Sequence, residues 1–170
     1  MKKNDSKTKR MVLIAMLFAT AMVLSIVESM IPMPIPAPGV KFGLSNIVVM
    51  YAMFFLKKRD ALMIAILKGM FSALTKGAIA GLVGLTGGLF SIGIMAILFY
   101  VLKEKGSYFL YSMSGAVFHN IGQFVAISII YTNMAVVYYL PVLLVAGIAA
   151  GAITSLLLKI VLPALQRLEL

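Results

Sequence analysis

The sequence predicts an all-α fold: a polytopic membrane protein whose six transmembrane helices form one bundle. The first observation is composition. Of the 170 residues, 62% are hydrophobic and only 12% are charged, whereas a soluble domain is about half apolar and about a quarter charged. The second is patterning, because the apolar residues form long runs with short basic segments between them. A soluble body of this size could not cover so much apolar surface, which excludes soluble, disordered and ordinary secreted proteins.

The first spanning helix is expected at Met11–Met30, after a basic tail over residues 1–10. A span needs roughly 20 mostly apolar residues, and this run has that length. It resembles a signal peptide, but it ends at Glu28 and Ser29 without a clear small-residue cleavage site, so we interpret it as a span. Alternating prolines follow and predict an extended loop at the membrane surface, because proline does not continue a helix: Pro32, Pro34, Pro36 and Pro38.

Five further apolar runs complete the bundle. Polar segments separate them at residues 57–60 and 103–106 and at Asn133, and the glycine-rich segment Gly77–Gly88 blurs the boundary between the third and fourth spans. The expected spans are Gly43–Leu56, Ala61–Thr75, a run that follows the glycine-rich segment and ends at Leu102, Tyr108–Tyr131 and Val136–Leu162. Together they predict one transmembrane domain over residues 11–165 and a short tail over 166–170.

The basic residues predict that both termini are cytoplasmic, in a multi-pass protein of the cell membrane. Short cytoplasmic loops hold the excess of lysine and arginine in membrane proteins. With six spans and the N-terminus inside, twelve basic residues lie inside, and only Lys41 and Lys76 lie outside. The inner set is Lys2, Lys3, Lys7, Lys9, Arg10, Lys57, Lys58, Arg59, Lys103, Lys105, Lys159 and Arg167. The net charge of +10 is therefore mainly an insertion signal, with some attraction to anionic membrane lipid, and nucleic acid is not needed to explain it.

Lys68 is an ionisable residue inside a predicted span. It lies nine residues after Arg59, which is roughly 13 Å along a helix and near the middle of a ~30 Å hydrocarbon core. Such groups are costly in a membrane and usually face a cavity or a partner. Lys68 either snorkels or bonds backbone carbonyls, or it contacts an anionic ligand or Glu28. Lys76, on a similar face, could continue a basic path to the exterior.

The fifth span carries three polar residues on one stripe, near its middle. His119 and Gln123 are four residues apart, and Asn120 overlaps their face. Such a stripe either holds helices together by hydrogen bonds or lines a site. Small residues elsewhere permit close helix packing by the same principle, and we expect it at Gly77, Gly81, Gly84, Gly87, Gly88, Gly147 and Gly151.

A polar outer rim is expected where the proline loop meets the second span. Glu28 ends the first span, and Gly43 marks a helix N-terminus, whose free amides favour an anion. Lys41 precedes this glycine and Asn46 follows it. The candidate substrate-binding residues are thus Lys41, Asn46, Lys68, Lys76, His119, Asn120 and Gln123.

Several kinds of chemistry have no residues to support them. The chain has no cysteine and no G-x-x-x-x-G-K-[ST] phosphate loop. Its only aspartates, Asp5 and Asp60, are far apart, whereas enzymes of prenyl diphosphates need clustered carboxylates to hold magnesium. We therefore expect no enzyme, no metal site and no cofactor.

Three segments resemble the small membrane family called Gx transporters, also labelled heptaprenyl diphosphate synthase component I. They are residues 38–48 (PGVKFGLSNIV), 87–91 (GGLFS) and 115–123 (GAVFHNIGQ). The family often carries arginine where this chain has Lys68, which keeps the charge but loses the bidentate fork. The six-span plan also resembles the substrate-binding S components of energy-coupling factor importers. There an Ala-x-x-x-Ala pattern docks the coupling subunit, and Ala15 and Ala19 match it.

Three functions remain open from the sequence. The first is a substrate-binding membrane subunit that takes up a small nutrient or cofactor precursor from outside, energised by a coupling subunit with ATPases. The second is a non-catalytic membrane accessory subunit in prenyl diphosphate or quinone metabolism, as the family label implies. The third is a structural subunit of a flavin- or quinone-linked electron-transfer system. The sequence does not name the ligand.

Overall fold

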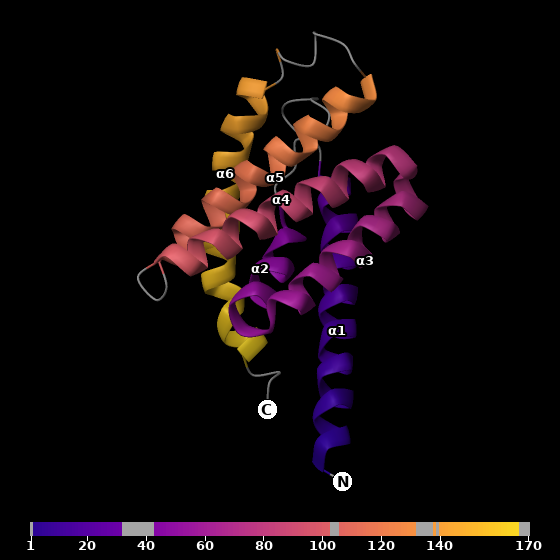
Figure 1. Ribbon diagram of the computed structural model, residues 1–170, viewed down its shortest axis with the longest axis vertical. Coiled ribbons are helices and arrows are strands. Elements are labelled where there is room, and N and C mark those ends of the chain that lie inside the picture. Colours follow the sequence, from indigo (N-terminus) through magenta and orange to yellow (C-terminus); the bar gives the residue numbers. More distant parts are fainter. Residues whose placement is uncertain (1, 32–42, 103–105, 132–137, 139, 167–170) are drawn as a thin grey trace.

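Six helices, in the order the sequence predicts, make up the computed structural model, which describes residues 2–31, 43–102, 106–131, 138 and 140–166 (Figure 1). The helices are α1 (Lys2–Met30), α2 (Asn46–Phe55), α3 (Lys58–Lys76), α4 (Ala78–Leu102), α5 (Tyr108–Tyr131) and α6 (Leu140–Gln166). The all-α prediction is confirmed. The proline loop lies outside the described residues.

Four of the six helices are long and apolar enough to cross a membrane. They contain the stretches Lys7–Met30, Ala78–Leu102, Tyr108–Tyr131 and Leu140–Ile160. Large apolar side chains are exposed on α1, α3, α4, α5 and α6, for example Val23, Leu74, Tyr100, Ile129 and Ile160. Apolar outer faces are expected where lipid, rather than water, surrounds the helices. The chain is therefore a polytopic helical membrane protein.

The second predicted span differs most from the structure. α2 has ten residues, about 15 Å of helix and half of a hydrocarbon core. Seven of its ten residues are buried, so its apolar character serves the protein core rather than lipid. Residues 43–45 form a turn before it, in which the Asn46 amide donates to the Gly43 carbonyl at 2.9 Å.

The segment around α2 nevertheless connects the two ends of α1. The Gly43 amide donates to Glu28, near the end of α1. Asp60, at the start of α3, binds Arg10, near the beginning of α1. Arg10 and Glu28 are eighteen residues apart on one helix, which is about 27 Å. Residues 43–60 therefore run the length of a membrane span, although only ten of them form α2.

Other boundaries also differ from the sequence prediction. The basic tail is not separate, because α1 begins at Lys2. The glycine-rich segment is helical from Ala78 onward, and the break falls at Gly77, whose φ of 95° suits glycine. The last helix begins at Leu140 and extends to Gln166, so residue 166 belongs to α6 rather than to the tail.

Small residues let α3, α4, α5 and α6 pack closely, as predicted at four of the glycines. A Cβ at Gly81 would lie 2.4 Å from the Ala73 Cβ, and one at Gly151 would lie 2.7 Å from the Met113 Cα. Gly87 and Gly147 are similarly close to α5. Gly88 is looser, with a Cβ position 3.5 Å from the Ala65 Cβ. The prediction is wrong for two of them, Gly77 and Gly84, which have open space at the Cβ position.

Candidate functional site

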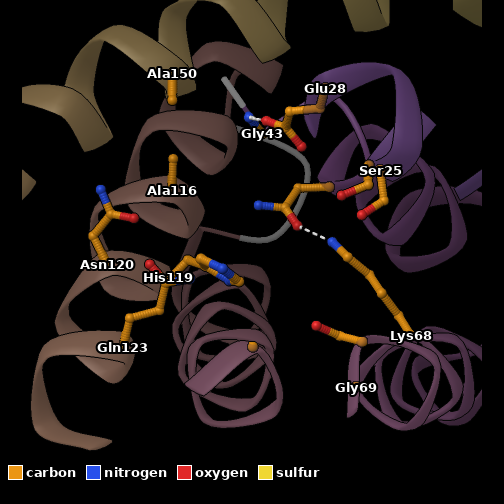
Figure 2. Close-up of a pocket in the computed structure, with 14 residues that line it drawn as sticks. Ser25, Glu28, Gly43, Lys68, Gly69, Ala116, His119, Asn120, Gln123 and Ala150 are labelled. Carbon is orange, nitrogen blue, oxygen red and sulfur yellow. Dashed lines mark hydrogen bonds between the residues drawn. The ribbon is translucent and has the colours of Figure 1, made fainter. Parts of the chain in front are cut away.

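A polar cavity lies among the helices, lined by residues from all six (Figure 2). It offers about 50 Å³ to the centres of water-sized molecules, several times the roughly 10–15 Å³ that one buried water needs. Nine of its fourteen lining residues are polar or charged: Ser25, Glu28, Ser45, Asn46, Lys68, Ser72, His119, Asn120 and Gln123. Such a concentration of polar groups inside an apolar bundle is costly unless the groups bind one another or a ligand.

Five of the seven candidate substrate-binding residues line this cavity: Asn46, Lys68, His119, Asn120 and Gln123. The structure does not bring Lys76 to it, because this residue is exposed at the last position of α3. Lys41 lies outside the described residues. The cavity thus joins the middle of α3 and the middle of α5 with the N-terminus of α2.

Lys68 points inward. Its ammonium donates a hydrogen bond to the Asn46 Oδ1 at 2.6 Å, and Figure 2 shows its side chain directed toward the centre of the cavity, with His119 reaching inward from the opposite wall. Lys68, Asn46 and His119 also line a smaller hollow next to Val49 and Ser91. Lys68 therefore lines both the polar cavity and this smaller hollow.

Glu28 is the negatively charged lining residue of the cavity, whereas Lys68 is the positively charged one. Its side chain is only 5% exposed, and its Oε1 accepts the backbone N–H of Gly43. Gly43 has a φ of 76°, a left-handed conformation that favours glycine. A Cβ there would also lie 3.3 Å from the Thr154 Oγ1. The sequence placed Glu28 on the outer rim but not among the binding residues, although a carboxylate inside an apolar run was a usable signal.

The polar residues of α5 both hydrogen-bond to another helix and line the cavity, and the sequence had left these two roles open. Asn120 joins two helices, since its Nδ2 donates to the Leu143 carbonyl of α6 at 2.6 Å. Gln123 is only 3% exposed, and its Oε1 has no hydrogen-bond partner among the described residues. An unmatched buried amide oxygen costs about 1–3 kcal/mol, so this group is available to a ligand donor.

Serines complete the lining and were missed by the sequence analysis. Ser25, Ser45 and Ser72 come from α1, the turn before α2, and α3. A hydroxyl can donate and accept, so these residues suit a ligand with both kinds of group. Single serines are common in membrane helices because they can bond their own backbone, and this hid them in the sequence.

No group of three or more His, Cys, Asp or Glu residues within the described part of the chain could hold a metal ion.

A comparison with models of protein families shows which family the chain belongs to. The model of the family described as heptaprenyl diphosphate synthase component I matches residues 17–161. The chain belongs to this family. No curated protein sequence and no solved structure matches it significantly.

The residues that match the family model include the whole lining of the cavity, since every lining residue lies between Ser25 and Ala150. They also include Ala19 but not Ala15. Both alanines are exposed on α1, so this pair lies on an outer face of the helix bundle.

Proposed function

We propose that this protein is a substrate-binding integral membrane subunit, similar to an S component, for uptake of a small nutrient or cofactor precursor. The observation that carries this proposal is the polar cavity enclosed by an apolar bundle. Buried polar groups in a membrane are expensive and are retained where they serve a ligand or an ion. The protein acts by binding, and we assign it no catalytic role.

The position of the cavity supports entry of the ligand from outside. Lys68 and His119 lie near the middle of α3 and α5, whereas Glu28 and Asn46 lie near the end of α1 and the start of α2. The cavity thus extends from mid-depth toward the end of the molecule opposite Arg10. With a cytoplasmic N-terminus, that end faces the exterior.

The ligand role predicts the behaviour of Lys68→Met and His119→Ala. Each variant weakens binding of the small molecule that co-purifies with the protein by about 1–3 kcal/mol, the scale of a lost buried or charged hydrogen bond. We would measure affinity by titration and folded stability by thermal unfolding of the same samples in detergent. The matched control is Lys76→Met, which removes the same charge from the exposed end of α3. Lower thermal stability with unchanged affinity would instead assign both residues to packing.

Energy for uptake comes from a partner in this proposal, since the chain has no phosphate loop. We place the coupling subunit on the face of α1 that carries Ala15 and Ala19. Both residues are exposed, and small residues let a second helix approach closely in a membrane.

The docking proposal predicts that Ala15→Leu with Ala19→Leu abolishes co-purification with an ATPase and its coupling subunit, while yield and monodispersity are retained. The control pair is Val12→Leu with Met16→Leu, on neighbouring exposed positions of α1. Normal co-purification of the alanine double variant would exclude this docking face.

A second candidate function follows from the family description, which names a component of heptaprenyl diphosphate synthase. In this role the protein is a non-catalytic membrane accessory subunit. Asp60 is already engaged by Arg10 and does not serve a magnesium site in this proposal. Co-purification of a soluble prenyl synthase, instead of an ATPase, would favour it.

A further inference from the structure

We propose that Glu28 sets the charge selectivity of the cavity, so that the ligand is a small, net-neutral molecule with both hydrogen-bond donors and acceptors. This inference rests on the proposed function, because it concerns the ligand of the same site. It also changes the expectation from the sequence, in which the N-terminus of the second span would receive an anionic ligand.

The N-terminus of α2 is the first feature that bears on the charge of the ligand. Free backbone amides at a helix start favour a negative charge, and the chain supplies that charge itself. The Glu28 carboxylate accepts the N–H of Gly43, three residues before α2 begins at Asn46. Glu28 is buried and lines the cavity. An anion that approached this end of α2 would therefore meet a buried carboxylate.

The formal charges of the described lining residues balance one another. Among the described lining residues, Glu28 is the one carboxylate and Lys68 the one ammonium group, and the two formal charges cancel. The Lys68 ammonium already donates to Asn46 at 2.6 Å. Charges inside a bundle are costly unless paired, so a diphosphate would bring several negative charges that the lining does not compensate. A net-neutral ligand leaves the balance intact.

The uncharged polar groups of the lining call for a ligand with both donors and acceptors. Gln123 lines the cavity, is 3% exposed, and has an Oε1 without a partner among the described residues. This oxygen needs a donor. The hydroxyls of Ser25 and Ser72 can donate or accept. A ligand with N–H or O–H donors as well as acceptor oxygens satisfies these groups, and the volume of about 50 Å³ open to the centres of water-sized molecules favours a small one.

The experiment uses radiolabelled sulfate as an anion probe, because its charge does not change near neutral pH. Saturable binding is measured on the full-length protein in detergent at constant ionic strength. The central variant is Glu28→Gln, which removes the charge but keeps an amide oxygen that can accept the Gly43 N–H. Glu28→Asp is the charge-conserving control, and Glu28→Gln with Lys68→Met restores a neutral lining.

We expect Glu28→Gln to bind sulfate at least tenfold more tightly than the wild-type protein. We expect the aspartate control and the double variant to resemble the wild-type protein. Sulfate binding by the wild-type protein as tight as by Glu28→Gln overturns the proposal, and so does a folded Glu28→Gln that gains no sulfate binding.

A second measurement needs no variant. Small molecules released from the purified wild-type protein are identified by mass spectrometry, and their net charge at neutral pH is determined. A net-neutral compound supports the proposal, whereas an anionic one overturns it. An anionic compound together with an intact ATPase complex would leave the uptake role standing and remove only the ligand class. Co-purification of a prenyl synthase would instead overturn the uptake role itself.

Discussion

At Gly87, α4 packs closely against the part of α5 that carries His119 and Gln123. A Cβ at this position would lie 2.8 Å from the His119 carbonyl oxygen and 2.9 Å from both the Gln123 Cγ and the His119 Cε1. Contacts below 3 Å require a shift, and here one of the three atoms belongs to the backbone. The glycine therefore allows α4 to support the two side chains that face the cavity.

Gly87→Ala should consequently destabilise the protein by about 1–3 kcal/mol, the usual cost of overpacking. Thermal unfolding in detergent measures this effect, and ligand affinity should fall as well because His119 and Gln123 must move.

Gly93→Ala is the matched control for Gly87→Ala. Gly93 lies in the same helix with open space at its Cβ position. There the alanine should be neutral or stabilising, since it has the higher helix propensity. Equal effects of the two substitutions would contradict a close contact at Gly87.

Some residues of the site could be predicted from the sequence, and some of its contacts could not. Lys68 and His119 could be predicted because ionisable groups in apolar runs are conspicuous. The bond between Glu28 and the Gly43 amide could not, because it depends on how the chain returns after residues 32–42. The same holds for Asn120, whose acceptor is a backbone carbonyl twenty-three residues away.

At the scale of elements, a bidentate ion pair joins the beginnings of α1 and α3. The Arg10 Nη2 lies 2.5 Å from the Asp60 Oδ1, and the Arg10 Nε donates to Oδ2 at 3.1 Å. Asp60 is 2% exposed and also accepts the Lys57 amide at 3.2 Å, where it caps α3. A planar guanidinium matches a carboxylate in this way. The pair therefore fixes the level of α3 relative to α1.

Arg10→Met should lower the midpoint of thermal unfolding, because it leaves the buried Asp60 carboxylate without its cation. Lys9→Met is the control, since it removes an equal charge from an exposed neighbouring position. We expect the control to unfold at the wild-type temperature. Identical midpoints for the two variants would show that the ion pair does not hold these helices together.

The elements themselves were only partly predictable. Hydropathy located α1, α4, α5 and α6 because each presents a long apolar face to lipid. It misjudged the length of α2, because a short helix surrounded by protein and a membrane span are equally apolar in sequence. Seven buried residues in a ten-residue helix distinguish the two cases only once the neighbouring helices are known.

At the scale of the whole molecule, the beginning of α1 and the end of α6 lie at the same end of the bundle (Figure 1). The ion pair between Arg10 and Asp60 places the start of α3 at this end too. These three points agree with an even number of crossings. The basic residues, twelve against two in the six-span arrangement, predict which side of the membrane this end faces.

A reporter fused after Leu170 should therefore be active only in the cytoplasm, because short cytoplasmic segments hold the excess of basic residues. A second reporter, inserted at Gly77 between α3 and α4, should be active only outside, since the Gly77 turn follows a helix that starts at the cytoplasmic end. The two fusions together test the crossing of residues 43–60, which contains the short α2. If the ten-residue helix did not belong to a crossing, and the N-terminus stayed inside, both reporters would change sides: the one after Leu170 would be active outside and the one at Gly77 in the cytoplasm. The cavity could then not open outward in the way that uptake requires.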